Sequence, residues 1–424
     1  VTDLLLEATR IRLRADVPVG AYVSGGLDSS GLTALVAKQF NNQLDTFGIR
    51  FEETGFDEGE YQSQVVDLLQ TNHHEACIKN AHIHEVFDRV VWHSERPLLR
   101  TSPVPLYLLS SVVRNNGLKV VLTGEGADEV FGGYNIFKET KIRRFWSRDP
   151  DSSSRHRLLQ QLYPYVFTDP RSACALQFFF RRYLTETEDN FYSHRLRWDS
   201  TSNNYFYFSD NFLEQLGGYN PLDDLRDHLP GDFSSRDSFS KTQYLEMKIF
   251  MSNYLLSSQG DRVAMAHSVE IRLPYLDHRL IEFMARVPAK WKIRGLNEKY
   301  ILKSVFRPLL PDEILQRKKT PYRAPIRQGL RLEESVFDDD FFSQEMVFNR
   351  QNLQILREKL ERTSNPSEVD DMGLTGILST YFFHKNFLES TVQSPVNNRI
   401  RTIIDKRKLR KQRTSDQESL QPGV

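Results

Sequence analysis

The stretch that decides the fold is Ser24-Gly25-Gly26-Leu27-Asp28-Ser29-Ser30. It follows the apolar run 19–23 and precedes a helical pattern of apolar residues, Leu32, Leu35 and Val36. The two glycines let the main chain approach an anion closely, and the free N–H groups at the start of the following helix can donate hydrogen bonds to it. The order of strand, glycine-rich loop and helix therefore predicts a phosphate-binding loop.

An aspartate stands in this loop where other phosphate loops carry a lysine. A Walker A loop contains Gly-Lys-Ser/Thr, and its lysine reaches the β- and γ-phosphates. Here that lysine is missing and Asp28 is present, which makes chemical sense if the carboxylate holds Mg²⁺ beside the phosphates. The sequence of residues 24–30 resembles the pyrophosphate loop of enzymes that cut ATP between its α- and β-phosphates. The alternative is a serine- and glycine-rich turn without a ligand, and the order of the elements favours the phosphate loop.

The composition is that of a globular protein without a strong charge. Its 424 residues suffice for about two or three domains. Lys plus Arg and Asp plus Glu number 56 each, so net charge favours neither nucleic acid nor an anionic membrane. Cys77 and Cys174 have no metal-ligand or disulfide-framework spacing. With no long apolar run and a charged N-terminus, we expect a cytoplasmic protein without a membrane partner. Because the sequence starts at Val1 rather than Met, we also expect a piece of a longer chain.

Short β-rich runs alternate with helical patterns near the N-terminus. After an amphipathic helix over 4–14, the predicted strands are 19–23, 46–51, 75–78 and 119–123, and the predicted helices are 29–40, 57–70, 83–94 and 103–117. Runs that are apolar on both faces, such as 120–122, are typical of a parallel sheet covered by helices. We therefore predict an α/β fold with a doubly wound parallel sheet of the pyrophosphate-loop, ATP-binding type. Ligands of such sheets bind at the carboxyl ends of strands, so the loops after Val23, Ile49 and Thr123 should converge on one crevice.

The character of the sequence changes twice after this region. We expect one domain over 1–390, made of a nucleotide-binding α/β core over 1–150 and a mostly helical part over 151–390. The remaining residues, 391–424, form a basic tail, in which eight lysines or arginines stand against Asp405 between positions 399 and 413. No aromatic residue is interleaved there for base stacking, so a flexible terminus is favoured over nucleic-acid binding.

A second motif directly follows the predicted strand 119–122. It reads Thr123-Gly124-Glu125-Gly126-Ala127-Asp128-Glu129-Val130-Phe131-Gly132-Gly133-Tyr134 and holds three carboxylates and four glycines. Carboxylates crowded at a strand end repel one another unless a cation offsets their charge. We therefore predict that Asp28 and Asp128 approach one Mg²⁺ from neighbouring strand ends, together with substrate phosphates. Taken alone, the motif is equally compatible with an acidic turn and a glycine-capped helix.

Together the two motifs resemble the synthetase domain of class B, glutamine-dependent asparagine synthetases. Three further stretches continue the resemblance: 259–262 (QGDR) leading into 265–277 (MAHSVEIRLPYLD), 298–303 (EKYILK) and 317–322 (RKKTPY). The likeness spans roughly residues 2–390. The conjunction of these motifs in order is far more specific than any one of them.

The resemblance implies a role for each matched position. Groups that would hold adenine or line the nucleotide site belong to Val23, Ile49, Thr123 and Gly124. The cradle for the leaving pyrophosphate would consist of Ser24, Gly25, Gly26, Ser29 and Ser30. The metal-binding acids match Asp28 and Asp128. The catalytic positions match Lys299, which would neutralise charge on the phosphates, and Glu125, which would orient ammonia or accept its proton.

Three polar residues are weaker candidates for the substrate pocket: Arg100, Asp261 and Glu270. For Glu270, together with Arg262 and Arg272, a buried structural ion-pair network is at least as well supported as catalysis.

The reaction that the resemblance implies is ATP-dependent amide formation with ATP and Mg²⁺ as cofactors. The β-carboxylate of aspartate would attack the α-phosphorus, pyrophosphate would leave, and ammonia would displace AMP to give asparagine. The family's glutaminase domain, with its N-terminal cysteine nucleophile, has no counterpart in this sequence. We therefore expect a glutaminase domain or subunit as a partner.

Two other functions stay open. An adenylating enzyme of the β-lactam synthetase or peptide cyclase type would keep the same nucleotide loops, so the pocket around Arg100, Glu125 and Glu270 would have to discriminate. A non-catalytic homologue would be favoured by loss of Asp28, Asp128 or Lys299, and all of these are present.

Overall fold

The computed structural model describes residues 1–40, 44–53, 55–163, 170–320, 322, 324–326, 329–363 and 367–389. The chain divides into two compact units, Val1–Phe383 and His384–Val424. The described part of the second unit contains the short π-helix η7 (Lys385–Glu389), in which Lys385 and Glu389 form an ion pair of 2.6 Å. The basic tail predicted over 391–424 lies outside the described residues, and the domain boundaries predicted above stay predictions.

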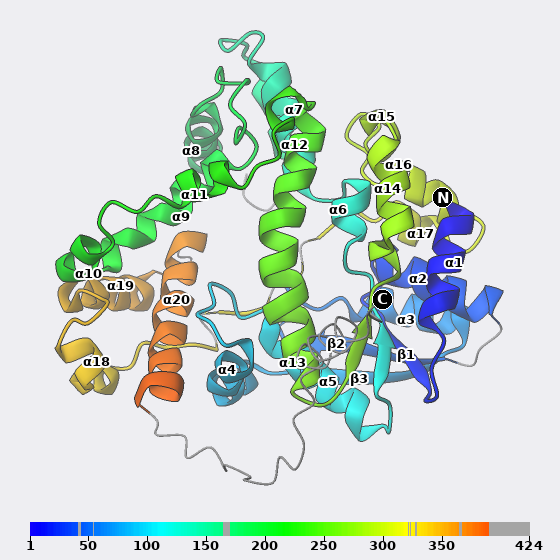
Figure 1. The fold of residues 1–424 in the computed structure, drawn as a ribbon, viewed down its shortest axis with the longest axis horizontal. Coiled ribbons are helices and arrows are strands. Elements are labelled where there is room, and N and C mark those ends of the chain that lie inside the picture. Colours follow the sequence, from blue (N-terminus) through cyan, green and yellow to red (C-terminus); the bar gives the residue numbers. More distant parts are fainter. Residues whose placement is uncertain are drawn as a thin grey trace, which may run out of the picture. The chain divides into compact units, whose positions relative to one another are not determined.

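The first part of the chain alternates helices and strands, as its apolar runs predict (Figure 1). In chain order its elements are α1 (Thr2–Arg12), β1 (Val19–Tyr22), α2 (Leu27–Gln39), β2 (Asp45–Phe51), α3 (Gly59–Leu69), β3 (Asn72–Ile78), α4 (Asn80–Ser94), α5 (Pro103–Asn115), β4 (Val120–Leu122), α6 (Ala127–Phe131) and α7 (Asn135–Trp146).

The later part is mostly helical, as predicted. The α-helices and the strand described there are α8 (Pro170–Arg181), α9 (Arg195–Thr201), α10 (Asp210–Gln215), α11 (Pro221–Asp227), α12 (Ser238–Leu245), α13 (Arg262–Met265), β5 (Glu270–Arg272), α14 (His278–Arg286), α15 (Ala289–Lys292), α16 (Tyr300–Phe306), α17 (Asp312–Leu315), α18 (Asp340–Ser343), α19 (Arg350–Arg362) and α20 (Glu368–His384). A long π-helix, η4 (Glu246–Asp261), joins α12 to α13. Short 3₁₀ turns complete the list: η1 (Arg155–Gln161), η2 (Ser202–Tyr207), η3 (Phe233–Ser235), η5 (Pro274–Leu276) and η6 (Glu334–Asp338).

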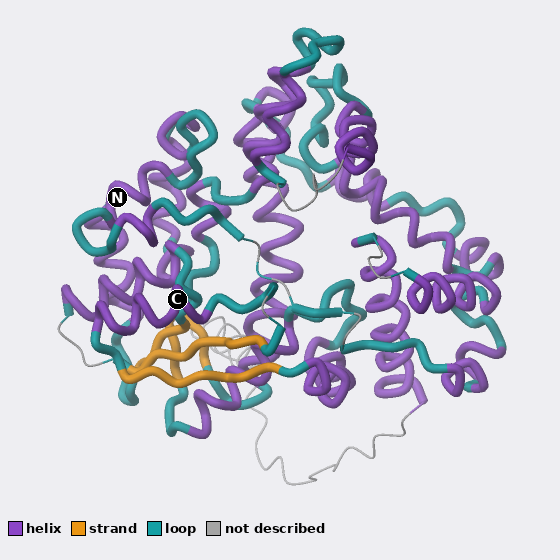
Figure 2. The backbone as a smooth tube through the Cα atoms, turned by 180° about the vertical axis from the view of Figure 1, so that it is seen from behind, coloured by secondary structure: helices purple, strands orange, loops and turns teal. Residues whose placement is uncertain are grey.

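Among the described residues, five parallel strands form one sheet in the order β3-β2-β1-β4-β5. Figure 2 shows this sheet in orange with helices around it. The chain moves outward from β1 to β3 and then returns to the other side of β1 with β4, so the strand order reverses between β1 and β4. The carboxyl ends of strands at such a reversal are where ligands of doubly wound sheets bind. The predicted α/β class and doubly wound parallel sheet are confirmed.

The central strands β1, β2 and β4 are largely buried on both faces of the sheet. On β4, the neighbouring side chains of Val121 and Leu122 are each fully buried, and they belong to two different hydrophobic clusters. The Val121 cluster includes residues of α4 and α5, and the Leu122 cluster includes residues of α1, α2 and α14. Consecutive strand residues point to opposite faces, so this division follows from helices covering both sides.

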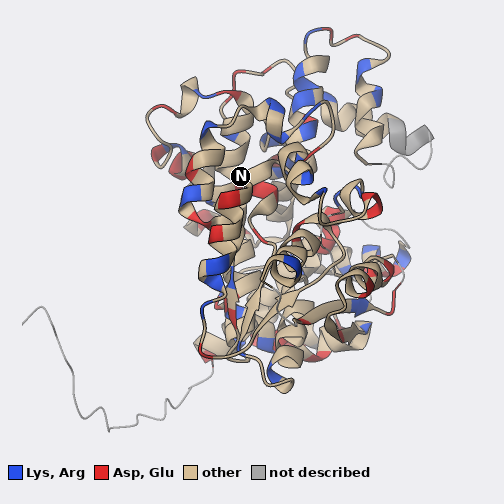
Figure 3. Ribbon diagram, turned by 90° about the vertical axis from the view of Figure 1, so that its right-hand side faces the viewer, with Lys and Arg blue, Asp and Glu red and all other residues tan. Residues whose placement is uncertain are grey.

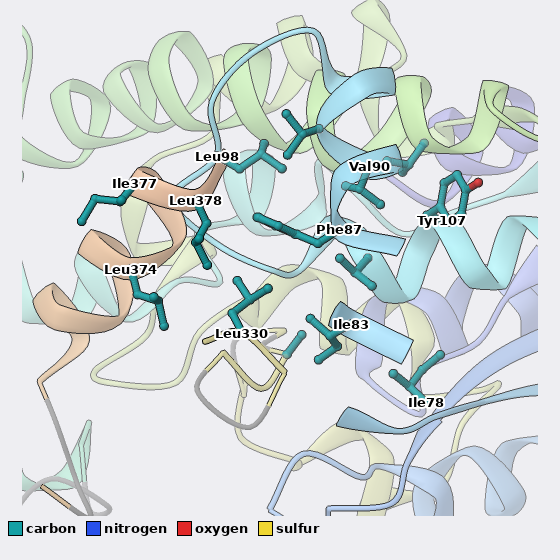
Figure 4. Packing of buried hydrophobic residues seen from close by; sticks show 14 of the residues in the cluster. Ile78, Ile83, Phe87, Val90, Leu98, Tyr107, Leu330, Leu374, Ile377 and Leu378 are labelled. Atoms are coloured by element: carbon teal, nitrogen blue, oxygen red, sulfur yellow. The ribbon is translucent and has the colours of Figure 1, made fainter. Parts of the chain in front are cut away.

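The larger cluster extends beyond the sheet to the end of the first unit. Figure 4 shows Leu374, Ile377 and Leu378 of α20 near Phe87 of α4, with Leu330 between the two helices. All of these side chains are buried. The last helix of the unit thereby packs against the helices that cover the sheet.

Along the ribbon in Figure 3, positions of Lys and Arg and positions of Asp and Glu are both spread over many elements. Across the described part of the chain, no helix is both long and apolar enough to cross a bilayer.

Candidate active site

The predicted phosphate loop connects β1 to the start of α2. Gly26 is the residue before α2, and Gly25 has a φ of +70°, which favours glycine. A side chain at Gly25 would also meet the backbone of Tyr61. The Ser29 hydroxyl accepts a hydrogen bond from the Ser24 N–H at 3.1 Å and lies 3.0 Å from the Ser24 hydroxyl. The loop is therefore tightly folded at the N-terminus of a helix of 13 residues, where phosphate oxygens bind well.

The second motif lies directly beside this loop. A Cβ at Gly124 would lie 3.0 Å from the Ser29 amide nitrogen, so the two loops approach to backbone contact. Gly126 and Gly132 have φ values of +89° and +72° and enclose the short helix α6. The structure thus brings the loops after β1 and β4 together, as the sheet topology requires.

Two carboxylates and two lysines meet where these loops touch. Lys299 Nζ lies 2.5 Å from Asp28 Oδ2 and 2.5 Å from Asp128 Oδ1, and Lys319 Nζ lies 2.8 Å from Asp128 Oδ2. We call Asp28, Asp128, Lys299 and Lys319 the charge quartet. Four segments far apart in sequence contribute to it, so the convergence is a property of the fold.

Burial and charge act in opposite directions on the two acids. Burial raises the pKa of Asp28, and Lys299 only partly offsets that effect. Burial also acts to raise the pKa of Asp128, but Lys299 and Lys319 together lower it to about 2. Asp128 is therefore a carboxylate at neutral pH, held by two ammonium groups.

The acids of the quartet fit a magnesium ion. Asp28 Oδ1 is buried without a hydrogen-bond partner among the described residues, although a buried carboxylate oxygen normally has one. No group of three or more His, Cys, Asp or Glu side chains that could hold a metal occurs in the described part of the chain. Two carboxylates are what Mg²⁺ usually takes from a protein when phosphates supply further ligands.

Glu125 lies beside a small pocket next to the quartet. The pocket is lined by Gly260, by the apolar side chains of Leu106, Val263, Ala264 and Ile271, and by the polar side chains of Tyr22, Thr123, Glu125 and Gln259. Glu125 Oε2 and the Tyr22 hydroxyl are buried and have no hydrogen-bond partner among the described residues. Burial raises the pKa of the Glu125 carboxyl, and Lys319 partly offsets that effect. A raised pKa makes the ionised carboxylate a better proton acceptor than an ordinary glutamate.

Of the two residues predicted to contact adenine from strand ends, Val23 lies at a strand end and Ile49 does not. Val23 directly follows β1, and its N–H donates to the Phe47 carbonyl at 2.9 Å. Ile49 lies inside β2 rather than at its end, because pairing with β3 continues to Phe51. The Ile49 carbonyl already accepts a hydrogen bond from Gln62 at 2.8 Å.

Two of the three weaker substrate candidates, Arg100 and Glu270, lie in ion pairs outside the quartet. Arg100 pairs with Glu368 of α20 at 2.7 Å. Glu270 pairs with Arg272 at 2.7 Å, whereas Arg262 pairs with Glu95. These are two separate, partly exposed pairs, so the alternative of one buried network is wrong. The reason is that β5 ends the sheet, which leaves Glu270 exposed.

Asp261 stands at the end of η4. Burial raises the pKa of Asp261, and the nearby Glu270 raises it further. The two acids therefore lie close enough to repel each other, although neither is part of the charge quartet.

Three residues of the site were not predicted as site residues. Lys319 pairs with Asp128, as described above. Arg317 pairs with Glu58, and its guanidinium lies 3.9 Å from the centre of the Tyr61 ring, which backs the phosphate loop. The Tyr275 hydroxyl donates to the Asp28 carbonyl at 2.8 Å. All three lie within the motifs 265–277 and 317–322, so their place in these motifs is the sequence signal that could have identified them.

A doubly wound parallel sheet with a glycine-rich loop and an acidic loop side by side at its strand-order reversal is an arrangement typical of nucleotide-binding α/β proteins. Residues 1–372 match the protein family described as asparagine synthase. The chain belongs to the asparagine synthase family.

Several curated relatives match this chain over most of its length. The protein named asparagine synthetase [glutamine-hydrolyzing] 1 of Bacillus subtilis is 30% identical over 78% of this chain and 50% of its own length. Amidase chry2 of Gibberella zeae is 30% identical over 77% of this chain and 52% of its own length. A putative asparagine synthetase [glutamine-hydrolyzing] of Mycobacterium bovis is 29% identical over 79% of this chain and 49% of its own length. The chain thus spans about half the length of these relatives.

Proposed function

We propose that this chain is an ATP-dependent amide ligase that adenylates the β-carboxylate of aspartate, releases pyrophosphate and joins ammonia to give asparagine. The observation that carries this proposal is the charge quartet at the strand-order reversal. Two acids, two lysines and a glycine-rich loop at a helix N-terminus form a site for a magnesium-bound polyphosphate.

In this proposal the phosphate loop binds the pyrophosphate half of ATP. The N–H groups at the start of α2 and the hydroxyls of Ser24, Ser29 and Ser30 would donate to its oxygens. Asp28 and Asp128 would hold Mg²⁺, which when bound neutralises charge on the leaving pyrophosphate. Val23, Ile49, Thr123 and Gly124 would line the remainder of the nucleotide site, as the resemblance implies.

The two lysines have the geometry of fixed cations. Lys299 is 3% exposed, and its ammonium lies between the two acids. As the bond from the α-phosphorus to the bridging oxygen breaks, negative charge grows on the pyrophosphate. Ammonium groups already fixed beside the pyrophosphate stabilise the transition state, in which this charge has grown, more than they stabilise the ground state. Lys319 would act in the same way from the opposite side of Asp128.

Glu125 would serve the second half of the reaction. Ammonia attacks the acyl carbon and must then lose a proton, whereas AMP leaves as an anion. A buried carboxyl with a raised pKa accepts that proton readily. The largely apolar pocket beside Glu125 would admit neutral ammonia more easily than ammonium, because burying an unpaired cation is costly.

A second candidate keeps the adenylation and changes the acid or the amine. The amidases of Gibberella zeae and Penicillium rubens are each 30% identical to this chain, the same figure as for the Bacillus subtilis synthetase. The nucleotide loops are equally compatible with both functions. The choice of acid would depend on the surroundings of Arg100, Glu125 and Glu270.

We also propose that a glutaminase domain or subunit supplies the ammonia. The relatives named glutamine-hydrolyzing are about twice as long as the segment that this chain matches. The proposal is that their remaining length carries this activity and that this chain receives ammonia at the Glu125 pocket.

The test is pyrophosphate release by the purified protein with ATP, Mg²⁺, ammonium and a panel of amino acids. Aspartate should give one pyrophosphate and one AMP for each asparagine formed. Pyrophosphate release with another acid and not with aspartate would favour the second candidate. Formation of ADP and phosphate, or no nucleotide cleavage with any acid, would overturn the proposal.

A further inference from the structure

Lys299 has an unusual backbone for a lysine. It stands immediately before α16 with φ +51° and ψ +33°, in the left-handed region. This conformation is strained for a residue with a Cβ. Such a conformation persists only where the surroundings fix it. The question is therefore what fixes the turn that carries this side chain.

The neighbouring residue, Glu298, is held on both of its oxygens. Lys138 Nζ of α7 lies 3.0 Å from Glu298 Oε2, and Lys303 Nζ of α16 lies 3.6 Å from Glu298 Oε1. Lys303 also donates to Asn297 Oδ1 at 2.6 Å. The side chains of Glu298, Lys138 and Lys303 are only 7%, 7% and 8% exposed. We call these four residues, Lys138, Asn297, Glu298 and Lys303, the anchor cluster.

The opposite charges of the anchor cluster stabilise one another in their buried positions. Burial acts to raise the pKa of Glu298, but Lys138 and Lys303 lower it below its usual range. Burial lowers the pKa of Lys303, and Glu298 opposes that effect. Breaking one partner out of a buried ion pair leaves an uncompensated charge, so such pairs hold their geometry firmly.

Two consecutive side chains are thus held in different clusters. Glu298 is anchored to α7, whereas Lys299 reaches Asp28 and Asp128. The Lys299 carbonyl accepts the first hydrogen bond of α16, from Lys303, at 2.9 Å. The left-handed turn therefore lies between two fixed points and cannot relax without moving one of them.

We propose that Lys138 and Glu298 are positioning residues that aim the Lys299 ammonium at the reacting phosphates. This inference rests on the proposed function of the charge quartet and extends it to residues outside the site. The physical reason is that preorganised charge stabilises a transition state only where its position is fixed in advance. A misplacement of about 1 Å can cost about 100-fold in rate.

The experiment is a double-mutant cycle with Lys138→Met and Lys299→Met, measured as pyrophosphate release. Lys138→Met alone should lower kcat about 10- to 100-fold and leave the KM for ATP nearly unchanged, whereas Lys138→Arg should restore most of the rate. In the Lys299→Met background, Lys138→Met should have little further effect, because it acts through Lys299. Losses that multiply in the double variant would overturn the proposal. Glu298→Gln serves as an independent probe, with the same expected pattern, if Lys138→Met does not fold.

A matched control separates positioning from stability. Glu139, next to Lys138 on α7, is buried and forms an ion pair at 2.8 Å with Arg197, whose side chain is partly exposed. Glu139→Gln should lower the melting temperature in the same way as Lys138→Met but leave kcat unchanged. An equal loss of kcat in Glu139→Gln would mean that any damage to α7 reduces activity, and would refute the specific role of Lys138.

A second readout does not depend on the proposed reaction. The rate at which Lys299 reacts with an amine-directed reagent, followed by mass spectrometry on the intact native protein, reports how firmly its ammonium is held. Lys138→Met should raise that rate several-fold relative to wild type and to Glu139→Gln. If the wild type releases no pyrophosphate with any acid, the proposed function fails, and unchanged labelling of Lys299 would refute the positioning role separately.

Discussion

Gly133→Ala is the substitution whose effect on the site follows most directly from the geometry. A Cβ at this position would lie 2.0 Å from Asp128 Oδ1 and 2.0 Å from Lys299 Cε. Non-bonded heavy atoms prefer separations of about 3.5–4.0 Å. The acid and the lysine would therefore each have to move by about 1 Å or more. Asp128 and Lys299 are 7% and 3% exposed, so neither can simply swing into solvent.

The expected cost of Gly133→Ala falls on rate more than on folding. Overpacking of this kind destabilises a protein by about 1–3 kcal/mol, which leaves a unit of this size folded. A displacement of about 1 Å in a fixed catalytic cation can cost about 100-fold. The assay is the initial rate of pyrophosphate release at saturating ATP, Mg²⁺, ammonium and aspartate, with melting temperatures measured in parallel.

The matched control is Gly231→Ala. A Cβ at Gly231 would meet no atom within 4 Å, so this variant should keep full activity. If Gly133→Ala also retains wild-type kcat and is folded, the close approach of Asp128 and Lys299 is not needed for the reaction, and the proposed catalytic role of the charge quartet is refuted.

Four further results are expected. Asp28→Asn should abolish pyrophosphate release without unfolding the protein, and turnover near that of wild type would remove Asp28 from the metal site. Lys299→Ala should lower kcat about 100-fold or more while changing the KM for ATP little; weaker ATP binding at unchanged kcat would contradict the role. Burial first, and then Asp128, raise the pKa of Glu129 to about 8, against about 4.3 in an unfolded chain. The stability that its neutral form contributes is therefore present below about pH 4.3 and is lost as pH rises through about 8. The melting temperature of Glu129→Gln minus that of wild type, both measured without Mg²⁺, should accordingly increase as pH rises across that range. A difference that does not change with pH would contradict the raised pKa of Glu129. The isolated 424 residues should form product from ammonium and not from glutamine, because Cys77 and Cys174 are both exposed free thiols without a hydrolase context; glutamate release blocked by a cysteine reagent would show a missed glutaminase site.

Much of the fold could be predicted because each signal was local. The four predicted strands agree with β1 to β4 within a few residues, and the phosphate loop lies between a strand and a helix as its glycines require. The fifth strand could not be found in this way. Glu270-Ile271-Arg272 is too short to show a strand period, and it becomes a strand only because the edge of β4 is there to pair with it.

The site was harder to predict because the sequence does not show in which direction each side chain points. Arg317, Lys318 and Lys319 are three consecutive cations, and only the folded backbone decides that Lys319 reaches Asp128 while Arg317 turns to Glu58. Ile49 was expected at a strand end, but pairing with β3 prolongs β2 beyond it. The roles of Asp28, Asp128, Glu125 and Lys299 stay predictions, now with a geometry that the experiments above can test.

Strand β5 lies far downstream of the other four strands in the sequence, and this order affects how the chain folds. Val120 pairs with Glu270, and Arg272 donates hydrogen bonds to the carbonyls of Arg12 and Arg14. The first half therefore cannot finish its sheet, or fix the end of its first helix, until residues far downstream have been synthesised. Contacts of such long sequence separation slow folding, and the open edge of β4 would meanwhile be free to pair with another chain. We accordingly expect a ribosome-bound or truncated first half to aggregate more readily than the full 424 residues.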